Sequence, residues 1–127
     1  MSHRPPAANI RIKRAYEPAE SGDGTRILID RLWPRGVSKE DARLDDWLKE
    51  IAPSSDLRKW FGHDPQRWTE FQKRYREELK QHEDMLRHLR ELASEGTVTL
   101  VYGAKDEEHN DAVALRDMLL GRKIDDG

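Results

Sequence analysis

Residues 26–31 (RILIDR) and residues 97–102 (TVTLVY) decide the fold. Each holds a short run of β-branched and apolar side chains, which is typical of a strand covered on both faces of a sheet. The chain between them has apolar residues at three- and four-residue steps, typical of helices. Buried strands separated by helices predict parallel pairing with a right-handed crossover. We therefore expect an α/β fold: a small, mostly parallel sheet with helical crossovers and covering helices, Rossmann-like in two or three layers.

Shorter sequence patterns predict the remaining strands and helices. Alternating side chains over residues 10–16 predict an edge strand. Ser38 suits the N-cap of a short helix over residues 39–43, and a second short apolar face follows at Trp47, Leu48 and Ile51. Ser54 or Ser55 suits the N-cap of another helix, which ends at Gly62 and buries Leu57, Trp60 and Phe61.

The longest predicted element is one helix that starts after Asp64 as N-cap, has Pro65 at its first position and stops at Gly96. Its apolar stripe comprises Trp68, Phe71, Tyr75, Leu79, His82, Leu86, Leu89 and Ala93. On its outer face the four-residue spacing predicts two ion pairs, Glu70 with Arg74 and Glu83 with Arg87. A last helix is expected over residues 107–120, with Asp106 as its cap.

Composition limits the function classes. A chain of 127 residues fits one domain, with residues 1–8 and 123–127 expected as disordered tails. The 23 basic and 25 acidic side chains give a net charge of −2, which disfavours a polyanionic partner. Cysteine is absent, so thiolate catalysis and disulfides are excluded. Without an apolar run of about 20 residues, we expect a cytoplasmic protein with no membrane segment.

Polar and aromatic residues follow both predicted central strands. Because ligand crevices in open α/β sheets lie at the carboxyl ends of the strands, we expect these residues to converge there. We assign candidate acid–base roles to His109, His63 and Asp30, and candidate ligand contacts to Arg31, Trp33, Arg35, Tyr102, Lys105 and Asn110. Cationic, indole and imidazole groups in one crevice suit an anionic or planar ligand.

Each of these assignments has a structural alternative. Asp30 and Arg31 equally suit a strand-end ion pair, and Trp33 equally suits a lid over the core. Arg35 is the stronger ligand candidate, because it lies between a proline and a glycine in a turn that presents it at low entropic cost. His82 lies in the apolar stripe and is expected to be packed.

Metal and nucleotide motifs are missing. The side chains of His63, Asp64, Asp106 and His109 are donors that zinc or iron accepts, but their spacing matches no metal motif. The phosphate-binding, dinucleotide and serine-hydrolase glycine motifs are also absent. We predict no metal and no cofactor.

Three long segments, residues 26–54, 57–79 and 99–119, together with the strand IRIKRAY, resemble the YeaO-like family of uncharacterised proteins, domain of unknown function 488. The resemblance implies a compact α/β domain in a bacterial or archaeal cytoplasm, and no established reaction. The family's characteristic sequence motifs include the candidate site positions, for example residues 30–36 and 60–65.

The leading hypothesis is a crevice that binds a small anionic, phosphorylated or nucleotide-like molecule, with Arg31, Arg35 and Lys105 as charge partners; whether the domain is an enzyme stays open. One alternative is a nucleic-acid-associated protein that uses the basic edge strand, although the net charge weighs against it. Another is a protein interaction module without catalysis, monomeric or homodimeric.

Overall fold

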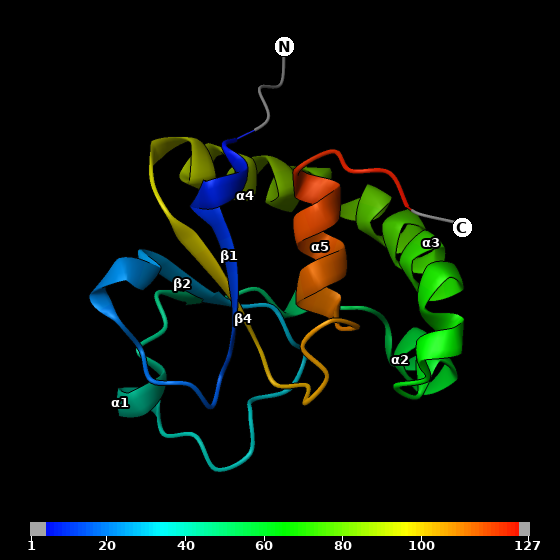
Figure 1. Ribbon diagram of the computed structural model, residues 1–127, viewed down its shortest axis with the longest axis horizontal. Coiled ribbons are helices and arrows are strands. Elements are labelled where there is room, and N and C mark those ends of the chain that lie inside the picture. The colour runs from blue at the N-terminus through cyan, green and yellow to red at the C-terminus, as the bar shows by residue number, and fades with distance from the viewer. Residues whose placement is uncertain (1–4, 125–127) are drawn as a thin grey trace.

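The computed structural model describes residues 5–124 and contains a four-stranded parallel sheet beside a group of helices (Figure 1). The strands are β1 (Ile10–Arg14), β2 (Thr25–Leu28), β3 (Asp46–Trp47) and β4 (Val98–Tyr102). Their order is β1-β4-β2-β3, and every neighbouring pair is parallel. The predicted α/β class, the edge strand and the two central strands are confirmed.

The two faces of the sheet are covered differently. On one face Val98, Leu100 and Tyr102 belong to the main core, which is completed by helices α3 (Trp68–Leu79), α4 (Glu83–Glu95) and α5 (Asp111–Leu119). On the other face Leu28 and Val101 pack against Trp33, Val37, Leu44 and Trp47. This second cover is the segment 33–47, which includes the four-residue helix α1 (Lys39–Ala42). Loops therefore replace a third helical layer.

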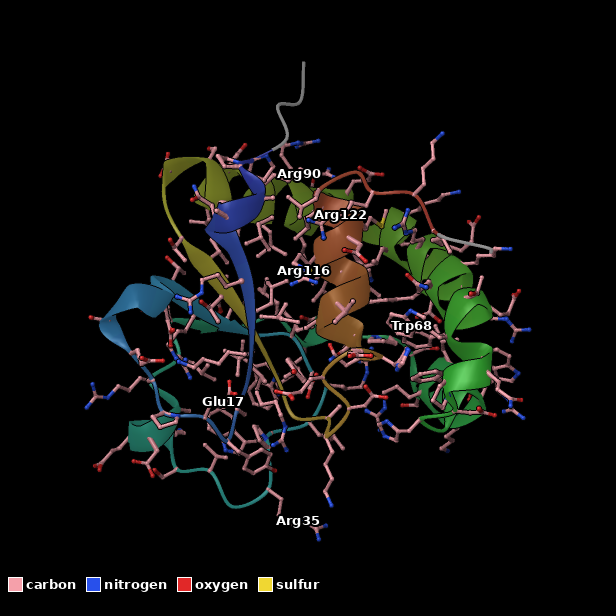
Figure 2. All side chains as sticks on the ribbon, in the orientation of Figure 1. Glu17, Arg35, Trp68, Arg90, Arg116 and Arg122 are labelled. Carbon is pink, nitrogen blue, oxygen red and sulfur yellow. The ribbon has the colours of Figure 1, made fainter. Side chains whose placement is uncertain are left out.

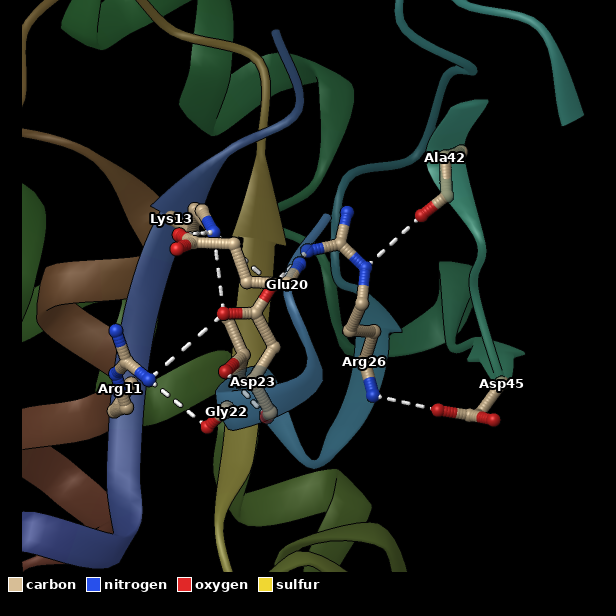
Figure 3. Close-up of polar contacts among 9 residues, drawn as sticks. Arg11, Lys13, Glu20, Gly22, Asp23, Arg26, Ala42 and Asp45 are labelled. Carbon is tan, nitrogen blue, oxygen red and sulfur yellow. Dashed lines mark hydrogen bonds and ion pairs between the residues drawn. The ribbon is translucent and has the colours of Figure 1, made fainter. Parts of the chain in front are cut away.

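Beneath these loops, a buried charge cluster ties β1 to β2 (Figure 3). The Asp23 carboxylate is fully buried; it accepts hydrogen bonds from Lys13 Nζ at 3.1 Å and from Arg26 Nη1 at 2.6 Å. Burial disfavours ionisation of Asp23, but hydrogen bonds from the Glu20 N–H, Lys13 and Arg26 outweigh it and lower its pKa. The cluster thus holds both strands through one carboxylate.

The predicted single helix over residues 65–95 is wrong, because the chain breaks it into α3 and α4. Residues 80–82 form a 3-10 turn, and His82 leaves the helical conformation at φ −124°. An unbroken helix over residues 68–95 would be about 40 Å long, more than the roughly 30 Å width of a small domain. The break lets α3 pack on α2 (Ser55–Phe61) and α5 while α4 packs on β4.

Several local predictions can also be compared with the structure. The Glu70–Arg74 pair forms at 3.0 Å, but Arg87 pairs with Asp84 instead of Glu83. Residues 5–8 are not a disordered lead: a 3-10 turn covers Ala7–Asn9, and Asn9 Nδ2 donates to the Ala93 carbonyl at 2.7 Å. The remaining tail residues, 1–4 and 125–127, lie outside the described range. No helix within residues 5–124 has the length and apolarity to cross a membrane.

Helix ends position the loops that carry the candidate site. Ser54 caps α2, with its Oγ accepting from the Leu57 N–H, and Gly62 ends this helix, as predicted. The predicted start of the last helix is wrong, since α5 begins at Asp111 with Asn110 as its cap. Asp106, expected as the cap, instead accepts from the N–H groups of Glu108 and His109 in a tight turn. Residues 103–110 are thereby left as a loop at the sheet edge.

Candidate functional site

A cavity of about 430 Å³ opens where β2 and β4 end. This volume is within the range of small-molecule sites. Its lining comes from three regions, the segment after β2, the α2–α3 region and the loop before α5: Asp30, Leu32, Trp33, Pro34, Pro53, Arg58, Lys59, Phe61, His63, Phe71, Gly103, Ala104, His109, Asn110 and Asp111. The expected convergence of the two strand ends is therefore present.

Asp30 connects the two strand ends. Its Oδ2 accepts the Gly103 N–H at 2.8 Å, and its carbonyl accepts from Trp47 Nε1 at 2.7 Å. A Cβ atom at Gly103 would lie 3.3 Å from the same Oδ2. Glycine therefore lets the backbone approach the carboxylate closely. Asp30 is held in place by backbone contacts rather than by Arg31.

Trp33 packs over the second core and also lines the cavity. Its Nε1 donates to the Val37 carbonyl at 2.7 Å, and its ring meets Trp47 edge-on at 5.5 Å, which anchors it over the second core. It is also half-buried in the cavity wall. Beside it, Leu32 is 66% exposed, so the cavity has an apolar lip.

Both candidate histidines reach the cavity, from different elements. His109 Nδ1 lies 3.0 Å from Asp106 Oδ2, and its ring meets Trp68 edge-on at 5.3 Å. Hydrogen bonds from the Glu108 N–H and from His109 lower the pKa of Asp106. His63 is exposed and has a left-handed backbone with φ 58°. Such a conformation costs about 1–2 kcal/mol in a residue with a side chain, and it is often retained at functional sites.

The cations at the cavity differ from those predicted. Arg31 turns the other way, donating from Nη2 to the Ala52 carbonyl at 3.4 Å and lining a separate cavity. Arg35 is exposed and extends away from the rest of the protein (Figure 2). Lys105 is exposed and does not line the cavity. The lining cations are Arg58 and Lys59 of α2, which are exposed and form its rim.

Tyr102 and Asn110 have structural roles. Tyr102 is only 2% exposed and belongs to the main core, and burial raises the pKa of its phenol. Asn110 lines the cavity, but its oxygen caps α5 through the Val113 N–H and its Nδ2 donates to the Asp106 carbonyl. Asn110 therefore shapes the cavity while its polar atoms are already paired.

The least expected feature is a pair of carboxyl groups. Asp111, the first residue of α5, lines the cavity together with Asp30. Burial raises the pKa of Asp111 well above its ordinary value of 3.8, and the Asp30 charge raises it further.

This pair should make the native state less stable as the pH rises. Because the pKa of Asp111 is raised by folding, its unfavourable contribution begins above 3.8 and is complete once the pH exceeds the native pKa. We predict that Asp111→Asn increases the free energy of unfolding by about 0.5–2 kcal/mol at pH 8, with no gain at pH 3.5. Urea unfolding at both pH values measures this, with the exposed Glu107→Gln as control; equal gains at both would contradict it.

The histidine and aspartate candidates for metal ligation are not gathered at one place in the described part of the chain. Within residues 5–124, no three His, Asp or Glu side chains gather closely enough to hold a metal ion. Asp106 contacts His109, and Asp64 accepts from the Gln66 N–H at the start of the turn that leads into α3.

Comparison with known proteins finds relatives of nearly the same length. A family model described as the inactive DUF488-N3 subclade matches residues 9–126. The uncharacterised protein YeaO of Escherichia coli is 48% identical over 111 residues, which is 87% of this chain and 96% of that protein. The uncharacterised protein Rv3073c of Mycobacterium tuberculosis is 41% identical over 114 residues, 89% of this chain and 95% of that protein. No solved structure matches.

Proposed function

The chain belongs to the YeaO-like DUF488 family, and from this premise we propose that it is a cytoplasmic binding domain for a small nucleotide-like anion. The ligand occupies the strand-end cavity and is not turned over there. The observation that carries the proposal is the cavity's composition: it combines exposed cations at the rim, aromatic walls and a pair of carboxyl groups in one space.

Each part of the cavity suits one part of such a ligand. Arg58 and Lys59 provide charge-assisted hydrogen bonds for a phosphate or another anionic group. The half-buried Trp33 indole, with the Leu32 lip, provides an apolar surface on which a planar ring can lie. The carboxyl pair provides acceptors for the polar edge of that ring.

Binding without turnover is supported by two observations. The residues that line the cavity include no serine, threonine or cysteine to act as a hydroxyl or thiol nucleophile. The matching family model is described as an inactive subclade. His109 and Asp30 are each held by other protein groups, which favours a shaping role for both.

The alternative functions have weaker support. A nucleic-acid surface would need free cations on the edge strand, but Lys13 is 8% exposed and paired with Asp23, and Arg11 donates to the Gly22 carbonyl. An interaction module would need an apolar patch, whereas the exposed large apolar side chains within residues 5–124 are Tyr16 and Leu32. The oligomeric state stays a prediction.

A thermal-shift screen tests the proposal. Nucleoside monophosphates, sugar phosphates and dicarboxylates are added to the wild-type chain, and a ligand at 100 times its Kd should stabilise the native state by about 2.7 kcal/mol. We predict stabilisation by nucleotides. The double variant Arg58→Ala/Lys59→Ala should weaken their binding about tenfold or more, because each lost charged hydrogen bond is worth about 1.5–3 kcal/mol at best.

The matched control is Lys80→Ala/Arg87→Ala, which also removes two exposed cations but lies outside the cavity lining. It should bind nucleotides like the wild type. If both double variants lose affinity equally, the cavity is not the site, and if none of the compounds binds the wild type, the proposed function is wrong.

A further inference from the structure

The His109 imidazole is held on the cavity wall by two contacts. Its Nδ1 lies 3.0 Å from Asp106 Oδ2, and its ring meets the Trp68 ring edge-on at 5.3 Å, with 79° between the two planes. The Asp106 carboxylate is itself fixed, because its Oδ1 accepts the N–H groups of Glu108 and His109. The fold therefore sets the position and the plane of the imidazole before any ligand enters the cavity.

The contact with Asp106 determines which nitrogen of His109 faces a ligand. Hydrogen bonds from the Glu108 N–H and from His109 lower the pKa of Asp106, so this group is a carboxylate at neutral pH and can only accept. Nδ1 must then carry a hydrogen. Among residues 5–124, Asp106 is the hydrogen-bond partner of the ring, which leaves Nε2 for a molecule in the cavity. Nε2 is an acceptor in the neutral ring and a donor in the imidazolium.

We propose that His109 binds the anionic group of the ligand as an imidazolium, through a charge-assisted hydrogen bond from Nε2, with Asp106 as its positioning residue. This inference rests on the proposed function and adds that a proton enters the protein together with the anion. The His109 side chain is 28% exposed, whereas Arg58 and Lys59 are exposed at the rim. Solvent and salt therefore screen a charge on His109 less than they screen the rim cations.

The ligand's own charge favours this protonation. The titratable and charged groups that face His109 come from its own loop, the end of β2, the start of α5 and the α2 region: Asp106, Asp30, Asp111, Arg58, Lys59 and His63. The contact from α3 is the uncharged Trp68 ring. The acids favour an imidazolium and the cations oppose it. A phosphate dianion adds two negative charges to this set, so binding shifts the balance towards the imidazolium.

Isothermal titration calorimetry with AMP and GMP between pH 7 and 8.5 tests the inference, because the phosphate of both nucleotides is mostly doubly charged in this range. Wild-type affinity should fall about three- to tenfold as the pH rises from 7 to 8.5, since fewer molecules carry the proton that binding requires. Paired buffers of different ionisation enthalpy should show uptake of roughly half a proton or more per nucleotide at pH 7.5.

Two variants assign this proton to a residue. His109→Gln should bind at pH 7 about as weakly as the wild type binds at pH 8.5, without proton uptake. Asp106→Asn keeps an oxygen that accepts the two N–H groups of the turn, but it removes the charge beside the ring, so uptake at pH 7.5 should decrease. The matched control is His88→Gln on α4, which removes an exposed histidine outside the cavity lining and should behave like the wild type.

Wild-type binding that is independent of pH and takes up no proton would overturn this inference and leave the proposed function standing. Uptake that persists in His109→Gln would also overturn it, because the proton would then belong to another group, such as His63 or Asp111. If His109→Gln does not fold, the wild-type uptake and the Asp106→Asn variant still decide the question. Absence of binding by both nucleotides would overturn the inference and the proposed function together.

Discussion

Replacing Asp23 by asparagine will lower the free energy of unfolding by about 3–5 kcal/mol, the cost of leaving buried Arg26 without its carboxylate and Lys13 with only the exposed Glu20. Asp23 is 0% exposed, Arg26 3% and Lys13 8%, so neither cation can recover its hydration when the carboxylate is lost (Figure 3). Chemical denaturation followed by circular dichroism measures the change. The matched control is Asp84→Asn, whose side chain is 95% exposed and whose loss should cost about 0.5 kcal/mol.

The pH dependence of this variant gives a second check. Because folding lowers the pKa of Asp23, its stabilisation is present above 3.8 and is lost as the pH falls through the native value. Wild type and Asp23→Asn should therefore converge in stability at acidic pH. Adding Lys13→Met to Asp23→Asn should recover part of the loss, since it removes a buried charge whose remaining carboxylate partner is the exposed Glu20. A loss below 1 kcal/mol at pH 7 would show that the cluster is not structurally important.

Phe71→Ala will also cost about 3–5 kcal/mol, and it will weaken ligand binding at the same time. Phe71 is 2% exposed and stacks on Phe61 at 4.4 Å, with Trp68 and Tyr75 at 5.6 and 5.8 Å. It belongs to the main core and to the cavity lining, so its loss leaves a void that joins the cavity.

The control for this prediction is Phe71→Leu, which keeps most of the buried volume and should cost about 1.5 kcal/mol or less. Urea unfolding gives both free-energy changes. Nucleotide titration shows whether removing the Phe71 ring from the cavity wall weakens ligand binding. Equal stability of the alanine and leucine variants would contradict the packing role given to Phe71.

Strands and caps could be predicted from local patterns because their signals are local. The apolar runs at residues 26–31 and 97–102 mark the two central strands, and Ser54 and Gly62 mark the ends of α2. The helix break at residues 80–82 has no such signal: no proline or glycine lies there, and the stripe continues through His82. The break comes from tertiary packing, which requires both halves to stay on the core.

The candidate site was predictable in position but not in its charges. Parallel strands place the residues after β2 and β4 at one edge of the sheet. The positions of Asp30, Trp33 and His109 at this edge could therefore be predicted from the sequence. After Leu28 the chain leaves the strand, and strand alternation no longer tells where Arg31 and Arg35 point. Asp111 was missed because Asp106 was assigned as the cap; the Asn110–Asp111 step is itself a cap signal that places an acid at the start of α5.

The most direct test of the central claim, that the strand-end cavity is the binding site, is a backbone amide NMR titration of the wild-type chain with GMP. We predict saturable shifts at Gly103, Ala104 and His109 from the loop before α5, and at Lys59 from α2, with small changes at the Lys13–Asp23 cluster on the other face. No shifts at the cavity, or shifts confined to the edge strand β1, would contradict the account.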